Sequence, residues 1–115
     1  MRIAIAGSRG MVGSSIVRNL QSEFDVIQLS REELDLTDRG ATIGYISKLR
    51  PDVIIDAAAK VGGIGANNQN PVEFLQINLQ IQKQLNGGCA FRRRWAINIL
   101  RIIVHLSQEY TETYY

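Results

Sequence analysis

Short apolar runs alternate along the chain with longer segments in which apolar residues recur at helical spacing. The runs at 2–6, 25–29 and 52–57 are short and β-branched, as parallel strands buried on both faces tend to be. The segments at about 11–21, 39–49 and 71–84 are long enough for helices. In the first helix the apolar residues predicted to face the sheet are Met11, Val12, Ile16, Val17 and Leu20. Because right-handed crossovers join such elements, the order predicts a doubly wound α/β half-fold with a parallel sheet.

The composition limits the chain to one small domain and identifies no partner. Its 115 residues are 45% hydrophobic and 21% charged, which is enough for a core. The formal net charge is only +2, so we expect no nucleic-acid partner, although Arg92, Arg93 and Arg94 form a basic cluster. With the single cysteine Cys89 and the single histidine His105, we expect neither an internal disulfide nor a metal site. The chain starts on a strand rather than a signal peptide and has no membrane-spanning run, so we expect a cytoplasmic protein.

A glycine-rich turn directly follows the first predicted strand. Gly7 permits the tight turn, Gly10 allows backbone to approach a phosphate, and Gly13 lets the next helix pack on the sheet. The N-terminus of that helix faces the anion, so the stretch predicts a nucleotide pyrophosphate site. The spacing Gly-x-x-Gly-x-x-Gly resembles the fingerprint of the short-chain dehydrogenase/reductase superfamily. A plain glycine-rich turn is the alternative interpretation.

The residues after the second predicted strand bear on the type of cofactor. An acidic residue at the strand end would accept hydrogen bonds from the adenosine ribose and favour NAD, but this strand ends in Leu29-Ser-Arg31. Arg31, together with Arg9 in the glycine turn, offers donors for the additional phosphate of NADP. The alternative is that both arginines are solvated charges, and the neighbouring Glu32 and Glu33 weaken the case for NADP. The arginines predict NADP as the cofactor.

A second motif narrows the resemblance to one family. The run Ala57-Ala-Ala-Lys-Val-Gly-Gly-Ile64 is followed by Asn67, Asn68, Pro71 and Asn78. Together with segments 7–13 and 31–36, this pattern resembles the GDP-L-fucose synthase family over roughly residues 1–82. Without the resemblance, the glycines at 62, 63 and 65 indicate a flexible loop.

The resemblance implies a cofactor, a substrate and a set of binding residues. The family is NADP-dependent and acts as an epimerase and reductase on a GDP-sugar, GDP-4-dehydro-6-deoxy-D-mannose. By the resemblance, the residues that bind the dinucleotide are Gly7, Ser8, Arg9, Gly10, Met11, Val12, Gly13, Arg31, Glu32, Glu33, Leu34, Asp35, Leu36, Ala57, Ala58 and Ala59. In the superfamily an acidic turn like 35–38 lies beside the adenine ring; alternatively, Asp38 caps the following helix. Another nucleotide-sugar epimerase or dehydratase is the alternative family.

The catalytic pair that the resemblance requires is missing from the sequence. The superfamily uses Tyr-x-x-x-Lys, in which the lysine lowers the pKa of the tyrosine phenol. The lysines are Lys48, Lys60 and Lys83, and none stands four residues after a tyrosine. We therefore predict no catalytic residue and an inactive chain, and we expect no family-like homodimer from this fragment.

The sequence beyond residue 84 departs from the family pattern. We divide the chain into 1–84, the N-terminal half of an NADP-binding Rossmann domain with a truncated sheet, and 85–115, an aberrant tail. Codons can be chosen for 86–91 and 101–107 that, read one base later, spell Met-Glu-Ala-Ala-His-Ser and Gly-Ser-Ser-Cys-Ile-Tyr-Pro. The second peptide resembles the family's catalytic serine motif, so we hypothesise a frameshift near codons 82–84.

Two other interpretations of the chain remain open. It can be a non-catalytic NADP-binding module, or such a module whose basic residues at 92–94 bind a membrane or a nucleic acid. Residues 97–106 could add a fourth strand or a helix, although no well-determined packing is expected there. A sheet truncated in this way would leave an exposed strand edge.

Overall fold

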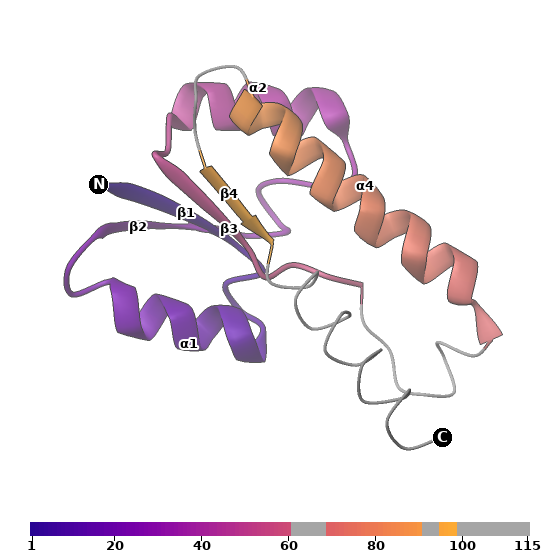
Figure 1. Cartoon of the computed structure of the whole chain (residues 1–115), viewed down its shortest axis with the longest axis horizontal. Coiled ribbons are helices and arrows are strands. Elements are labelled where there is room, and N and C mark those ends of the chain that lie inside the picture. Colours follow the sequence, from indigo (N-terminus) through magenta and orange to yellow (C-terminus); the bar gives the residue numbers. More distant parts are fainter. Residues whose placement is uncertain (61–68, 91–94, 99–115) are drawn as a thin grey trace.

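In the part of the chain that the structure describes, four parallel strands form one sheet in the order β2-β1-β3-β4 (Figure 1). The computed structural model describes residues 1–60, 69–90 and 95–98. The strands are β1 (Arg2–Ala6), β2 (Asp25–Leu29), β3 (Val53–Asp56) and β4 (Trp95–Asn98), and the helices are α1 (Met11–Leu20), α2 (Arg39–Leu49) and α4 (Pro71–Ala90). The predicted α/β class with a parallel sheet is confirmed.

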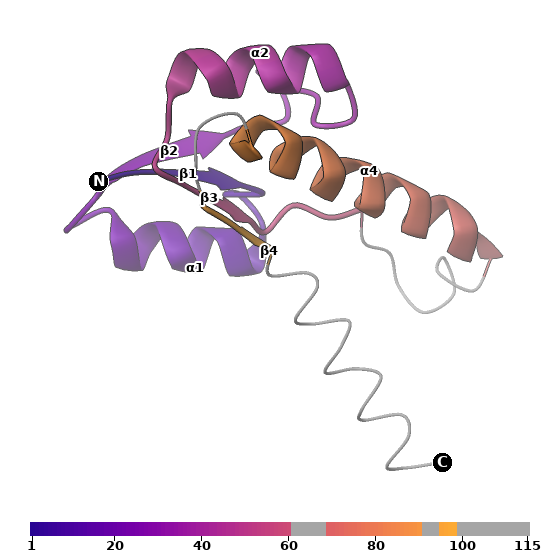
Figure 2. The ribbon, with the colours of Figure 1, turned by 45° about the horizontal axis from the view of Figure 1, so that its top comes forward.

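The central strand β1 is buried on both faces, which explains its unbroken apolar sequence. Ile3 and Ile5 pack with Val17 of α1 on one face. The residues of the opposite cluster come from the sheet, α2 and α4: Ala4, Ala6, Leu29, Ile46, Ile54, Ile81 and Leu85. Figure 2 shows this three-layer arrangement, with α1 on one side of the sheet and α2 and α4 on the other. The carboxyl ends of β1, β2 and β3 therefore lie at one edge, where ligands bind in open α/β folds.

The prediction for the buried face of α1 is wrong at its first two residues. Val17 is buried, but Met11 is 88% exposed and Val12 is 37% exposed. Met11 precedes Val17 by six residues, which at roughly 100° per residue places it about 120° around the helix from the buried stripe. The residue that does pack under the start of the helix is Gly13, which is buried.

The third helix and the last strand extend beyond the regular structure that the sequence predicted. α4 begins at Pro71 as expected but runs to Ala90 rather than to about 84. β4 then pairs with β3 in parallel, with Trp95 opposite Val53 and Asn98 opposite Asp56. A fourth strand was one of two options for residues 97–106, and the structure places it at 95–98; residues 99–106 lie outside the described part.

Candidate functional site

The glycine turn between β1 and α1 is shaped by backbone contacts that exclude side chains. Gly7 has φ +72°, a left-handed conformation, and a Cβ there would lie 2.5 Å from the carbonyl oxygen of Ala57. A Cβ on Gly13 would lie 2.1 Å from the carbonyl oxygen of Gly7. The Gly10 N–H donates to that same Gly7 oxygen at 2.9 Å. Two of the predicted glycines are thus required by the fold, whatever the turn binds.

Gly10 also leaves the start of α1 open to an anion. It is the N-cap residue and, as a glycine, has no side chain to accept a hydrogen bond from the first amides of the helix. Most helices satisfy these amides with a Ser, Thr, Asp or Asn side chain at the N-cap. Open amides at a helix N-terminus offer donors and a positive dipole end to a phosphate.

A cavity of about 300 Å³ lies in front of the glycine turn, at the carboxyl edge of the sheet. The predicted site residues that line this cavity are Gly7, Ser8, Arg9, Gly10, Arg31, Leu34, Asp35, Leu36, Ala58 and Ala59. The predicted residues outside its lining are Met11, Val12, Gly13, Glu32, Glu33 and Ala57. Segments 7–10, 31–36 and 58–59, distant in sequence, therefore meet at one cavity.

Six further lining residues were not among the predicted site residues. They are Leu29, Ser30, Thr37, Lys60, Ile77 and Ile81. Ile77 and Ile81 are four residues apart on α4, a spacing that places both on one helical face. The sequence analysis placed both residues in the helix predicted at 71–84 and gave them no further role; they reach the cavity because α4 passes the carboxyl edge of the sheet (Figure 2).

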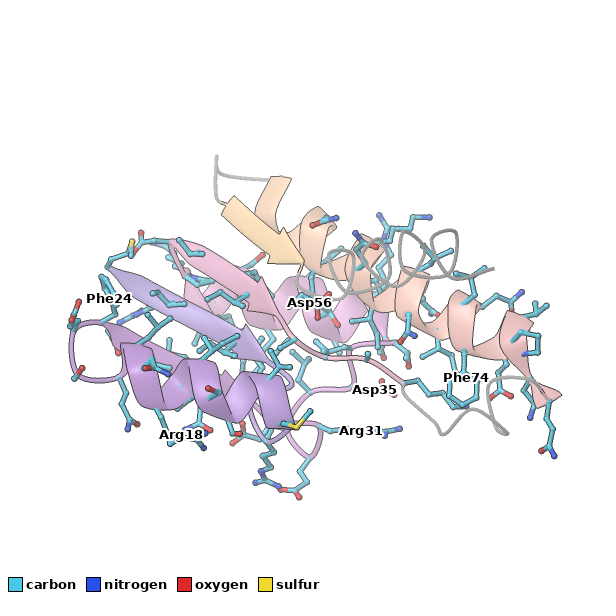
Figure 3. All side chains as sticks on the ribbon, turned by 60° about the horizontal axis from the view of Figure 1, so that its bottom comes forward. Arg18, Phe24, Arg31, Asp35, Asp56 and Phe74 are labelled. Carbon is cyan, nitrogen blue, oxygen red and sulfur yellow. The ribbon has the colours of Figure 1, made fainter. Side chains whose placement is uncertain are left out.

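Arg9 and Arg31 both line the cavity but differ in their partners. The Arg9 Nη1 donates to Glu32 Oε1 at 2.8 Å, and both side chains are more than 70% exposed. The hydrogen bond and the charge of Glu32 raise the pKa of the Arg9 guanidinium, so Arg9 stays charged. Arg31 forms no hydrogen bond or ion pair with another residue of the described part. Figure 3 shows Arg31 projecting outward from the loop that follows β2.

The part of the β2–α2 loop nearest α2 is held by side-chain hydrogen bonds. Asp35 Oδ1 accepts hydrogen bonds from the Thr37 N–H at 2.9 Å and the Thr37 hydroxyl at 2.7 Å. These bonds lower the pKa of Asp35, with a smaller contribution from the charge of Arg31. The Thr37 carbonyl accepts from Gln80 and Gln84 of α4, each at 2.8 Å. The loop is therefore tied to α4 as well as to itself.

Asp38 caps α2. Its Oδ1 accepts a hydrogen bond from the Ala41 N–H at 2.9 Å. Of the two roles that the sequence left open for Asp38, helix capping is confirmed, and Asp38 is not among the residues that line the cavity. Asp35 and Leu36 are the residues of this acidic turn that face the cavity.

The chain beyond β3 is held against α4 by Asn78. Its Oδ1 accepts from the Lys60 N–H at 2.7 Å, and its Nδ2 donates to the Lys60 carbonyl at 3.1 Å. The Lys60 ammonium pairs with Glu73 and lies 5.2 Å from the centroid of the Phe74 ring. Asn78 and Lys60, quoted for the family resemblance, therefore fix the third wall of the cavity. The glycines at 62, 63 and 65, with Ile64, Asn67 and Asn68, lie outside the described residues.

Asp56, the last residue of β3, is a buried carboxyl that the sequence analysis did not single out. It is 3% exposed, and burial raises its pKa to about 6, although the Ala58 N–H donates to its Oδ1 at 3.1 Å. Because side chains alternate along a strand, Asp56 shares a face with Ile54, toward α2 and α4. Figure 3 shows it at the carboxyl end of β3. Asp56 is not among the cavity-lining residues.

The described residues hold neither a candidate metal site nor a candidate membrane span. No group of three or more His, Cys, Asp or Glu side chains in these residues is placed to hold a metal ion. No helix within the described ranges is both long enough and apolar enough to span a bilayer.

The chain is similar to GDP-L-fucose synthases over its N-terminal part. It is 47% identical over 83 residues to GDP-L-fucose synthase 1 of Arabidopsis thaliana, which covers 70% of this chain and 26% of that protein. It is 44% identical over 86 residues to the GDP-L-fucose synthase of Escherichia coli, which covers 73% and 27% respectively. The resemblance read from the motifs is confirmed, and the chain spans about a quarter of the length of these relatives.

The fold and the wider family agree with this similarity. A GDP-mannoheptose C4 reductase from Campylobacter jejuni with NADP bound superposes with a TM-score of 0.71 at 27% identity, over 78% of this chain and 29% of that chain. The model of the NAD dependent epimerase/dehydratase family matches residues 3–106, which includes much of the segment predicted to be an aberrant tail. The chain belongs to the NAD dependent epimerase/dehydratase family.

Proposed function

We propose that this chain binds NADP in the cavity at the carboxyl edge of its sheet and is the cofactor-binding part of a GDP-L-fucose synthase. The observation that carries the proposal is the meeting of the glycine turn with Arg9 and Arg31 at one cavity. The similarity to GDP-L-fucose synthases supports the enzyme family, and the similarity to an NADP-bound reductase supports the cofactor class.

The cofactor's pyrophosphate would lie over Gly7–Gly10, where two glycines without a Cβ and the first amides of α1 face it. Arg9 and Arg31 would hold the additional phosphate at the adenosine end, because guanidinium groups donate paired hydrogen bonds to phosphate oxygens. Leu34, Asp35 and Leu36 would line the adenosine. Gly13 and Ala57 do not line the cavity. Their role would be structural, because both lie in close contact with Gly7 and support the turn.

Ala58 and Ala59 line the cavity after β3, so small side chains let a cofactor lie close to the backbone there. NADPH supplies a hydride to the sugar in a reductase of this family. We expect the GDP-sugar and the acid–base groups to be held by the part of the relatives that this chain does not span. The chain carries no Tyr-x-x-x-Lys pair, so we expect no NADPH-dependent reduction of GDP-4-dehydro-6-deoxy-D-mannose by the 115-residue protein.

The cofactor proposal is tested by titrating the full chain with NADPH and with NADH. We expect NADPH to bind more tightly, and Arg9→Gln and Arg31→Gln each to weaken NADPH about tenfold with little effect on NADH. Arg18→Gln is the matched control, since it removes the same charge from the exposed surface of α1, away from the cavity. Equal affinity for the two cofactors, or an equal effect of Arg18→Gln, would contradict the proposal.

A non-catalytic NADP-binding module is the second candidate. It is favoured by the continuation of α4 to Ala90 and by the pairing of β4 with β3, because these elements extend the sheet past residue 84. We propose the frameshift as the origin of segment 85–115, and sequencing of the coding DNA decides between the two. If the reading frame shifted by one base continues into Tyr-x-x-x-Lys, the enzyme fragment is supported. If that frame soon meets stop codons, the binding module is supported. In either case we expect a cytoplasmic protein, consistent with its single cysteine.

A further inference from the structure

The ion pair between Arg9 and Glu32 joins two walls of the cavity. Arg9 belongs to the glycine turn and lines the cavity, whereas Glu32 stands in the loop after β2, outside the lining. The two residues are 23 positions apart, and the Nη1 to Oε1 distance is 2.8 Å. Arg9, which the proposed function assigns to the cofactor's additional phosphate, is therefore already paired with the carboxylate of Glu32.

The pair is exposed enough to exchange for another anion. The side chains of Arg9 and Glu32 are 71% and 73% exposed. An ion pair this exposed shifts an equilibrium by a factor of about five or less, because water screens the charges and ordering two long side chains has an entropic cost. A phosphate that carries up to two negative charges and accepts several hydrogen bonds can displace one carboxylate.

We propose that Glu32 is a competitor built into the site, which occupies Arg9 in the absence of the phosphate and limits the preference for NADP over NAD. This inference rests on the proposed function. NAD has no phosphate at that position, so it leaves the pair intact. When NADP binds, Arg9 must break its ion pair with Glu32 or contact both anions. The additional phosphate also brings negative charge close to the Glu32 carboxylate. Arg31, with no ion-pair partner in the described part, would contribute without such exchange.

The proposal gives Glu32 a different role from the one implied by the family resemblance, where Glu32 was a cofactor-binding residue. A carboxylate after the second strand can also accept hydrogen bonds from the adenosine ribose, which would favour NAD. The two roles predict opposite results. A competitor weakens the phosphate-bearing cofactor, whereas a ribose acceptor strengthens the cofactor that lacks the phosphate.

The test is Glu32→Gln in the full chain, with NADPH and NADH titrated separately. We expect the Kd for NADPH to fall about three- to tenfold, because Arg9 is released and a like charge is removed, with the Kd for NADH within twofold of the wild type. Glu23→Gln is the matched control, since it makes the same charge change on an exposed residue that does not line the cavity. We expect it to alter neither Kd by more than twofold.

A double-mutant cycle sharpens the result. In an Arg9→Gln background, Glu32→Gln should tighten NADPH less than it does in the wild type, because only the direct repulsion remains. Raising the salt concentration should shrink the effect of Glu32→Gln, because both of its causes are electrostatic. Far-UV circular dichroism and thermal melting check that each variant folds like the wild type.

Three outcomes overturn the inference, and they are distinguishable from one another. If wild type prefers NADPH but Glu32→Gln leaves its Kd unchanged, Glu32 is not a competitor and the proposed function stands. If Glu32→Gln weakens NADH instead, Glu32 is a ribose acceptor. If wild type shows no preference for NADPH, the NADP assignment fails and this inference fails with it.

Discussion

Two walls of the cavity are built in different ways. The glycine turn after β1 is determined by sterics: Cβ atoms at Gly7 and Gly13 would collide with backbone oxygens. The loop after β2 is determined by side chains, with Asp35 bonded to Thr37 and Asp38 capping α2. One added Cβ atom disrupts the close packing of the glycine turn as a whole, whereas the hydrogen bonds of the loop can be removed one at a time. The first wall should therefore tolerate far less substitution than the second.

The largest effect is expected in the glycine turn. Gly13→Ala places a Cβ 2.1 Å from the Gly7 carbonyl oxygen, so the start of α1 must move off the turn. We expect the free energy of unfolding to fall by about 4 kcal/mol, measured by urea denaturation, and NADPH binding to be lost. If Gly13→Ala shows no cooperative unfolding transition in urea, the variant does not fold, which is a larger destabilisation of the same origin.

Gly44→Ala is the matched control for that substitution. A Cβ at Gly44, on the exposed surface of α2, would meet no atom within 4 Å. Alanine favours helices over glycine, so we expect this variant to gain up to about 1 kcal/mol of stability. Equal losses at both positions would show that the turn is not limited by sterics.

The second largest effect on stability is expected at Asp56, a carboxyl whose burial has an energetic cost. It directly precedes Ala57, which contacts Gly7 of the glycine turn. Because its folded pKa is about 6, above the ordinary value of 3.8, the folded state binds its proton more tightly than the unfolded state does. The contribution of Asp56 to the free energy of unfolding should therefore fall as pH rises from about 4 to 6. Asp56→Asn lacks this titration and retains an oxygen that can accept from the Ala58 N–H.

We expect the stability of Asp56→Asn relative to wild type to increase by about 2 kcal/mol between pH 4 and pH 7. Urea denaturation at several pH values measures the difference. Parallel pH profiles for the two proteins would show that Asp56 is not held in a desolvated position.

The smallest effect is expected in the side-chain wall. Asp38→Ala removes the acceptor of the Ala41 N–H and should destabilise the chain by about 1 kcal/mol, as the loss of an N-cap does. Asp38→Asn keeps an acceptor oxygen and should stay close to wild type. If Asn is as destabilising as Ala, the charge at the start of α2 matters rather than the cap.

The structural features around the cavity that the sequence predicted are those with local causes. Gly7 and Gly13 could be assigned to the turn because φ at Gly7 and close packing at both positions favour a residue without a side chain. The cap at Asp38 was among the alternatives because it depends on residues three positions apart. Met11 was misassigned because helical spacing tolerates several possible buried faces, and the contacts of Val17 with the sheet decide among them.

Residues with distant causes could not be predicted. Ile77 and Ile81 line the cavity because α4 crosses the edge of the sheet, and nothing in their local sequence distinguishes them from core residues. Glu32 seemed only to weaken the case for NADP, and its contact with Arg9 depends on two loops that are brought together by adjacent strands. The raised pKa of Asp56 likewise follows from burial, which is a property of the packed structure.

The sequence by itself determined the parallel α/β class, the glycine turn and the resemblance to GDP-L-fucose synthases. Strand burial, glycine geometry and motif spacing depend on residues that are close together in the sequence. Only the tertiary structure decided which residues face the cavity and which arginine is paired. It also decided that a fourth strand pairs with β3 at 95–98. These outcomes depend on contacts between elements far apart in the chain, and such contacts arise only when the strands are placed side by side.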